Sequence, residues 1–253
     1  MKILIIGATG DTGQRLLKLA LQEGHEVTVY IRNESKLEAQ SGDDAGPDYK
    51  VIVGDVFDRA SVVQACRDQQ VVINAAGNVG DGELFETLVQ SVSHAVEEGL
   101  GDGGRFWFFG GAGALDVPGT SKMTVNLPKV PALFRAHERN YHSVGSTSLN
   151  WSMLCPGPMT GAADGKPHQG LRISTDIWPV PRPAVTRLLP PIATALAFKL
   201  KMPEMTIAYE DAAKVILDNL DQDSPLAKKR VGVALPPGMK RSKDIQSLTG
   251  QGK

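Results

Sequence analysis

Residues 1–36 read MKILIIGATGDTGQRLLKLALQEGHEVTVYIRNESK, and this stretch decides the fold. The run Lys2 to Ile6 is apolar and β-branched after its first residue, which is typical of a central parallel strand. Residues 14–22 repeat apolar side chains at helical spacing, and a second apolar run follows at Val27–Ile31. The pattern therefore predicts a strand, a helix and a second strand, with a glycine-rich turn after the first strand.

The glycine-rich turn has the spacing of a site for a dinucleotide. Gly7 permits the tight turn, Gly10 lets a pyrophosphate approach the backbone, and Gly13 lets the helix lie close to the strand. Backbone N–H groups and the positive end of the helix dipole attract an anion at such a turn. We therefore predict that a dinucleotide binds here, in contact with Gly7, Thr9, Gly10, Asp11, Thr12 and Gly13.

The composition indicates a small-molecule partner. Lys plus Arg number 27 and Asp plus Glu number 28, so the net charge of −1 predicts neither nucleic-acid nor membrane binding.

Residues 190–202 form the longest apolar run, but two lysines interrupt it, which predicts a helix over a pocket or a dimer face. The core strand at residues 2–6 leads us to expect no signal peptide, and the two cysteines lack metal-ligand spacing. We expect a cytoplasmic monomer or homodimer.

Strands and helices alternate along most of the chain. Further strands are predicted at Lys50–Val53, Val71–Asn74, Phe106–Phe109 and Asn150–Leu154, with helices at Arg59–Arg67, Leu84–Glu98 and Pro131–Val144. This alternation predicts a Rossmann α/β fold, a doubly wound parallel sheet within residues 1–156. Prolines cluster after residue 156. We therefore predict that residues 157–253 form a small substrate-side lobe that completes the same domain. Within it we expect a helix at 208–220 and a late strand at 230–234, antiparallel or in the small lobe.

The residues after the second strand indicate which nicotinamide cofactor binds. An acidic side chain there would accept hydrogen bonds from the adenosine ribose and repel a 2′-phosphate. This chain instead has Arg32, with Lys36 close behind it and no acidic residue before Glu34. We therefore predict NADP(H), bound through Arg32 and Lys36. The alternative for Arg32 is a solvated surface charge.

Two later strand ends supply further candidate contacts. Asp55 and Val56 follow the third strand, where the Asp55 carboxylate can accept a hydrogen bond from the adenine amino group. The alternative for Asp55 is a helix N-cap or a turn. Small residues after the fourth strand let a ribose lie against the backbone, so we add Asn74, Ala75, Ala76 and Gly77.

These motifs resemble the short-chain dehydrogenase/reductase superfamily, in its atypical NAD(P)H-binding or NmrA-like branch. The motifs at 7–13, 32–36, 54–56 and 74–77 occur in the order of that branch. Residues 109–119 resemble the Gly-Gly-Ala-Gly block of NAD(P)H-binding oxidoreductases, residues 137–139 and 149–158 resemble biliverdin-IXβ and flavin reductases, and residues 208–213 resemble the branch's late tyrosine-acid-alanine motif. The resemblance spans residues 1–235 and implies cofactor contacts from Gly110, Gly111 and Pro156.

The acid/base residues depart from the superfamily pattern. Short-chain dehydrogenases use a Ser after the fifth strand and a Tyr-x-x-x-Lys helix, whose tyrosine transfers the proton that accompanies hydride. Here Gly110 and Gly111 occupy the Ser region, and Tyr141 is followed four residues later by Gly145. His137 and Tyr141 share a helix face and are the candidate catalytic residues. The alternative is that His137 caps or packs and Tyr141 lines the core.

A cofactor site without a Tyr/Lys pair suits flavin or quinone reduction, because the acceptor ring is electron-poor and water can supply the proton. We therefore expect an NADPH-dependent oxidoreductase that reduces a flat conjugated small-molecule acceptor. We expect residues 110–113 to form the floor of the acceptor site, with walls from residues 156–159, Trp178 and residues 190–202. The alternative for these glycines is that they serve only close helix–strand packing.

Two other functions stay open at this point. One is a carbonyl reductase or epimerase that uses Tyr141 or His137 as its acid. The other is a non-catalytic, NADP(H)-sensing regulator of the NmrA-like kind. His94 and His168 have no partner at metal-ligand spacing, so no metal site is expected.

Overall fold

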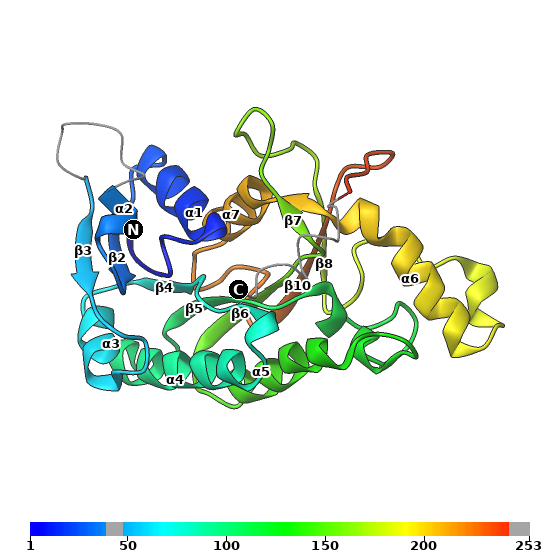
Figure 1. Ribbon diagram of the computed structural model, residues 1–253, viewed down its shortest axis with the longest axis horizontal. Helices are drawn as coiled ribbons and strands as arrows, with labels where there is room; N and C mark the ends of the chain where they lie inside the picture. Colours follow the sequence, from blue (N-terminus) through cyan, green and yellow to red (C-terminus); the bar gives the residue numbers. More distant parts are fainter. Residues whose placement is uncertain (39–47, 243–253) are drawn as a thin grey trace.

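The computed structural model describes residues 1–38 and 48–242, which fold around one large, mostly parallel sheet (Figure 1). Its strand order is β3-β2-β1-β4-β5-β6-β10-β8. The strands are β1 (Lys2–Ile6), β2 (Glu26–Ile31), β3 (Lys50–Val53), β4 (Val71–Asn74), β5 (Arg105–Phe109), β6 (Asn150–Cys155), β8 (Arg172–Thr175) and β10 (Lys229–Ala234). Neighbours from β3 to β10 are parallel, and β8 is antiparallel to β10. The predicted doubly wound Rossmann sheet is therefore confirmed.

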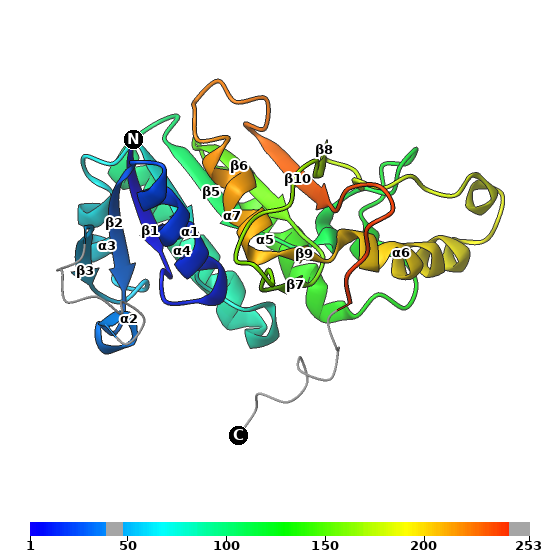
Figure 2. The ribbon, with the colours of Figure 1, turned by 90° about the horizontal axis from the view of Figure 1, so that it is seen from above.

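Helices cover both faces of this sheet (Figures 1 and 2). One face carries α1 (Asp11–Gln22) and α7 (Tyr209–Leu217), and the other carries α3 (Arg59–Cys66), α4 (Glu83–Leu100) and α5 (Arg135–Gly145). The short α2 (Ser35–Glu38) follows β2. The predicted helix at 131–144 is divided, because a 3-10 turn at Ala132–Phe134 precedes α5.

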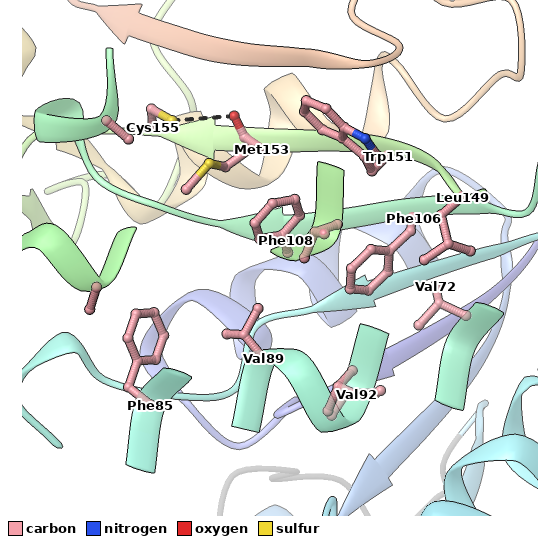
Figure 3. Packing of buried hydrophobic residues seen from close by; sticks show 14 of the residues in the cluster. Val72, Phe85, Val89, Val92, Phe106, Phe108, Leu149, Trp151, Met153 and Cys155 are labelled. Carbon is pink, nitrogen blue, oxygen red and sulfur yellow. Dashed lines mark hydrogen bonds between the residues drawn. The ribbon is translucent and has the colours of Figure 1, made fainter. Parts of the chain in front are cut away.

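Alternating side chains of the strands form two separate cores. In β1, Ile3 and Ile5 join the core under α1 and α7, whereas Leu4 and Ile6 join the core against α3, α4 and α5. Figure 3 shows the second core, where Phe106 and Phe108 of β5 lie above apolar side chains of α4. These two rings stack with centroids 5.6 Å apart. Burial on both faces explains why the central strands read as continuous apolar runs.

The last strand differs from the sequence-based expectation. β10 lies in the main sheet, where Gly232 pairs with Cys155 of β6 in parallel and with Ser174 of β8 in antiparallel orientation. The physical reason is the crossover through α7, whose apolar face packs on the sheet beside α1 and returns the chain to the start of β6. The expectation of a small-lobe strand is therefore wrong. The expectation of an antiparallel strand holds for the pairing with β8 but is wrong for the pairing with β6.

The remaining elements of residues 157–242 gather at the carboxyl end of β6. A two-stranded parallel sheet joins β7 (Met159–Thr160) and β9 (Ile207–Ala208), and α6 (Pro191–Met205) extends away from the main sheet (Figure 1). Among the helices of the described residues, none has both the length and the apolar character to cross a bilayer. Nor does that part of the chain contain a group of three or more His, Cys, Asp or Glu side chains placed for a metal ion.

Candidate functional site

The candidate cofactor residues meet at the carboxyl edge of the sheet. The chain passes from β1 to β2 and β3 on one side, then returns to β4 on the other side of β1. Ligands of open α/β sheets bind where the strand order reverses in this way. The loops that reach this edge contain the candidates at 7–13, 32–36, 55–56, 74–77, 110–111 and 156.

The three glycines of the first turn have different surroundings. Gly7 has a φ of +84°, and a Cβ there would lie 2.7 Å from the backbone N of Ala76. A Cβ on Gly13 would lie 2.2 Å from the carbonyl oxygen of Gly7. At Gly10 the nearest atom is that same oxygen at 3.5 Å, an ordinary contact, and φ is −81°. The predicted close helix–strand approach at Gly13 is present, and the pyrophosphate contact at Gly10 stays a prediction.

Backbone contacts hold this turn in place and leave the start of α1 open. The N–H of Gly10 donates to the carbonyl of Gly7 at 3.1 Å, and Nε2 of Gln14 donates to the carbonyl of Thr9 at 3.0 Å. Among residues 1–38 and 48–242, no side chain caps the first turn of α1, which begins with Asp11 and Thr12. The N–H groups of this first turn are therefore suited to bind an anion such as a pyrophosphate.

Arg32 and Lys36 are exposed beside the end of β2. Neither forms an ion pair with any residue in the described ranges 1–38 and 48–242. Asn33 lies between them and precedes α2, and its Oδ1 accepts from the N–H of Ser35, the first residue of that helix, at 3.0 Å. A guanidinium without an acidic partner in the described structure is available for a charge-assisted hydrogen bond to a phosphate. The 2′-phosphate contact stays a prediction.

Asp55 shapes a turn and does not cap a helix. Its Oδ1 accepts from the N–H of Phe57 at 2.9 Å, and its carbonyl accepts from the hydroxyl of Tyr30 at 2.9 Å. The N-cap of α3 is Asp58, whose side chain accepts from Ser61. The N-cap alternative for Asp55 is therefore wrong, and the turn alternative is present. The carboxylate stays exposed beside buried Val56, so the adenine contact remains a prediction.

The loop after β4 lies directly against the glycine turn. The Asn74 side chain accepts from the N–H of Ala76 at 3.0 Å, and Ala75 donates to the carbonyl of Ile6 at 2.9 Å. Gly77 has a φ of +105°, a value that favours glycine. Small residues are needed here because the loops after β1 and β4 touch. Their contact with a ribose is untested.

The glycines after β5 do not form an open floor. An added Cβ would lie 2.2 Å from Cε of Met153 at Gly110, 2.8 Å from Nε2 of His137 at Gly111, and 2.7 Å from Cγ1 of Val125 at Gly113. The space on the side-chain side of each glycine is therefore filled by protein. The expected room for a flat ring at these positions is wrong, and close packing accounts for the glycines. Backbone contacts of Gly110 and Gly111 with the cofactor remain predictions.

Two of the expected wall residues are also buried. The indole N–H of Trp178 donates to Oγ1 of Thr124 at 2.6 Å, and its ring lies 5.0 Å from that of Phe198 in α6. Trp178 therefore holds α6 against the body of the protein. The carbonyl of Pro156 accepts from the N–H of Ala112 at 2.7 Å, and its cofactor contact is untested.

His137 lies in an aromatic environment near the end of β5. Its side chain is 6% exposed, with ring centroids 5.6 Å from Phe85 in an edge arrangement and 6.2 Å from Phe134 in a stacked one. Within the described part of the chain, its Nδ1 has no hydrogen-bond partner. Burial lowers the pKa of His137 to about 4. The imidazole is therefore neutral at pH 7, and the packing alternative given for this residue is present.

The pH dependence of unfolding should report this buried histidine. The ordinary pKa of 6.5 is lowered to about 4, so between these values the unfolded chain binds a proton and the folded chain does not. His137 should therefore remove about 2 kcal/mol of stability between pH 7 and pH 5. Urea unfolding of the parent and of His137→Leu should show this difference in slope. Parallel pH profiles for the two proteins would contradict the neutral, buried state.

Tyr141 lies one turn along the same helix but has different neighbours. Its ring lies 4.7 Å below the guanidinium of Arg230 and 5.7 Å from the ring of Trp151. Arg230 is buried and donates to Asp116 at 2.8 Å and 3.1 Å. Burial of the guanidinium is compensated by that carboxylate and by the aromatic face. The cation next to Tyr141 thus comes from β10, where the sequence pattern gave no reason to expect it.

The acidic pair at the start of α7 is a structural clamp that sequence reasoning missed. Glu210 accepts from Nε of Arg15 at 3.3 Å and from the N–H of Ala162 at 2.9 Å. Asp211 accepts from the N–H of His168 at 2.6 Å. These bonds fasten the loop between β7 and β8 to α1 and α7, beside the carboxyl edge. Two adjacent acids in the first turn of an apolar helix were the available signal.

Comparisons with known proteins give the family and the fold of the chain. The model of a protein family described as NAD(P)H-binding matches residues 7–189. The protein YwnB of Bacillus subtilis (strain 168) is 29% identical over 170 residues, which is 62% of this chain and 71% of that protein. A short-chain dehydrogenase/reductase of Veillonella parvula DSM 2008, solved in complex with NADP, has a TM-score of 0.64 at 17% identity and covers 95% of this chain and 96% of its own.

A second solved structure, an anaerobillin reductase of Escherichia coli O157:H7, has a TM-score of 0.63 at 19% identity. The match covers 96% of this chain and 100% of that one. At these identities the two structures show a shared fold.

Proposed function

Because the chain belongs to the NAD(P)H-binding family, we propose that it is an NADPH-dependent reductase of the atypical short-chain dehydrogenase/reductase branch, acting on a flat conjugated acceptor such as a flavin, a quinone or a related pigment. The family is described as NAD(P)H-binding, and one neighbour in fold is an anaerobillin reductase. One observation carries the choice of acceptor. The helix that bears the acid in short-chain dehydrogenases here presents a neutral, buried His137 and a Tyr141 held by Arg230.

The preference for NADPH is supported by charge at the end of β2. Arg32 and Lys36 are both exposed, and the intervening acid, Glu34, follows Arg32 by two residues. A guanidinium binds a phosphate in a fork of two hydrogen bonds, whereas a carboxylate would repel it. The first turn of α1 would bind the pyrophosphate through its N–H groups, and the loop after β4 would lie against a ribose.

The choice of acceptor follows from the lack of need for a proton-donating side chain in the reaction. The bound dinucleotide supplies a hydride. An electron-poor conjugated ring takes up hydride without a protein acid, and water then provides the proton. A simple ketone instead requires a proton donor in the transition state. The protein's contribution to the first reaction is positioning, which the rigid edge of the sheet can provide.

Substitution of the two candidate acids should separate these reactions. We expect Tyr141→Phe and His137→Leu each to keep the NADPH-dependent reduction of a quinone or flavin within roughly tenfold of the parent, since loss of a true general acid costs about 10²–10⁴-fold. Steady-state NADPH oxidation with flavin, quinones and simple ketones is the measurement. Each variant should first be shown to fold and to bind NADPH.

Two results would overturn this proposal. A thousandfold loss in a folded, NADPH-binding Tyr141→Phe would favour a carbonyl reductase that uses this tyrosine as its acid. NADPH binding without oxidation by any of these acceptors would favour a regulator that senses NADP(H).

We propose the cytoplasm as the compartment. Cys66 and Cys155 are both free and buried. Burial raises the pKa of the Cys66 thiol to about 12, which keeps it protonated and inert. Free buried thiols fit a reducing environment.

A further inference from the structure

The first turn of α1 carries a negative charge where the proposed function requires an anion. Asp11 is the first residue of the helix, and its side chain is 69% exposed. The pyrophosphate of a dinucleotide and the Asp11 carboxylate would both lie at the positive end of the same helix dipole. Because two anions at one helix end repel each other, this carboxylate opposes cofactor binding unless other groups compensate its charge.

Arg15 supplies a cation one turn further along α1. Its Nη1 lies 3.7 Å from Oδ1 of Asp11 and donates to the Asp11 carbonyl at 3.0 Å. Long side chains on a helix point toward its N-terminus, which explains why Arg15 reaches back to this residue. An exposed pair of this kind contributes little on its own, because ordering two long side chains costs entropy.

The start of α7 holds the Arg15 guanidinium in place. Its Nε donates to Oε1 of Glu210 at 3.3 Å, and its central carbon lies 5.4 Å from the centre of the Tyr209 ring. Glu210 is itself fixed, since its side chain is 7% exposed and its other oxygen accepts from the N–H of Ala162 at 2.9 Å. Figures 1 and 2 show α1 and α7 side by side on one face of the sheet. The fold therefore orders the cation beside Asp11 before any ligand binds.

Tyr209 also acts on Asp11 directly. Burial raises the pKa of the Tyr209 hydroxyl, and the negative charge of Asp11 and a hydrogen bond to that carboxylate raise it further. The hydroxyl is therefore protonated at pH 7 and donates to Asp11. The Asp11 carboxylate thus has a cation and a hydroxyl as partners, and α7 supplies the hydroxyl and fixes the cation.

We infer that Arg15 and Tyr209 are positioning residues for the dinucleotide, which compensate the charge of Asp11 and so allow the first turn of α1 to bind a pyrophosphate. This inference rests on the proposed binding of NADPH and adds a role for α7, which lies outside the glycine turn. Arg15 acts through Asp11, because its Nε and Nη1 already donate to Glu210 and to the Asp11 carbonyl. NADPH and NADH both contain a pyrophosphate, so the effect should be equal for the two, unlike that of Arg32.

A double-mutant cycle between Arg15 and Asp11 tests this inference on the full chain. Calorimetry at low salt should show that Arg15→Gln weakens NADPH and NADH binding by about tenfold each, whereas Arg15→Lys, which keeps the charge, binds within about threefold of the parent. In the Asp11→Asn background the same Arg15→Gln change should cost about twofold or less. Lys18→Gln is the matched control, because it removes an exposed positive charge from the same helix and should also cost about twofold or less.

Thermal unfolding without ligand should show that each variant folds, and Tyr209→Phe takes the place of Arg15→Gln in the cycle if the latter does not. A loss of equal size with and without the Asp11 carboxylate would overturn the inference, because Arg15 would then bind the phosphates itself. So would a loss no larger than that of Lys18→Gln, which would leave Arg15 a purely structural role. The proposed function survives either result if the parent binds NADPH, whereas a parent that binds neither dinucleotide would overturn both.

Discussion

Replacing Gly10 with valine should abolish NADPH binding and leave the fold largely intact. In the part of the chain that the structure describes, the nearest atom to a Cβ at this position is the Gly7 carbonyl oxygen at 3.5 Å, and the φ of −81° is open to any residue. The added side chain would instead occupy the space through which a pyrophosphate approaches the turn. We expect at least a hundredfold loss of affinity, about 2.8 kcal/mol, against a cost to folding of roughly 1 kcal/mol. Calorimetry with NADPH and thermal unfolding without it measure the two quantities.

Gly13→Ala is the matched control for this experiment. Its Cβ would lie 2.2 Å from the carbonyl oxygen of Gly7, so α1 must shift and the free protein should lose roughly 1–3 kcal/mol of stability. The two substitutions in one turn should thus have opposite signatures, one on the ligand and one on the fold. A Gly10→Val protein whose melting temperature still rises with NADPH would refute the phosphate turn.

Removal of the charge at the end of β2 should change which nicotinamide cofactor binds. Arg32→Ala and Arg32→Asp should weaken NADPH binding by about 1.5–3 kcal/mol, the range for a charge-assisted hydrogen bond. NADH binding should stay unchanged or improve, because it lacks the 2′-phosphate and an Asp can accept from its ribose. Calorimetric titrations with both dinucleotides measure the difference, and Lys18→Ala controls for loss of one exposed positive charge elsewhere.

Equal losses of NADPH and NADH affinity in the Arg32 variants would reject the 2′-phosphate role. Because the guanidinium is exposed, unfolding curves of the variants should overlay that of the parent, which distinguishes such a result from a general folding defect.

The strand–helix–strand unit at the start of the chain was predictable because its signals are local. Five successive residues of β1 and the apolar spacing of α1 each reflect burial within one element. The predicted strands at 50–53 and 71–74 match β3 and β4 in both bounds. Because parallel strands with helical crossovers have a fixed handedness, the order of elements also determined that the candidate loops meet at one edge.

The reasons for individual glycines were not predictable from sequence. Gly10 and Gly111 look alike in the chain, yet a Cβ on Gly10 would make an ordinary contact of 3.5 Å with the Gly7 carbonyl oxygen, whereas a Cβ on Gly111 would lie 2.8 Å from Nε2 of His137. That difference depends on α5, which is placed against the end of β5 by packing on α4 and the sheet. A repeated small residue indicates close approach, but it does not say whether protein or ligand approaches.

The environment of the candidate acids was likewise decided by distant parts of the chain. Helical spacing correctly placed His137 and Tyr141 a turn apart, but only the folded chain adds Phe85 around the first and Arg230 above the second. The pKa of His137 depends on burial, which periodicity along one helix cannot measure.

The sequence by itself determined the Rossmann sheet, the glycine turn after β1 and the positive charge after β2, because each depends on neighbouring residues. The tertiary structure decided the place of β10 beside β6, the closed packing at 110–113 and the apolar outer face of α6. Each of these features depends on which side chains stay exposed after segments that are distant in the sequence have packed together. Local periodicity records that a side chain is apolar, whereas burial depends on contacts made across the fold.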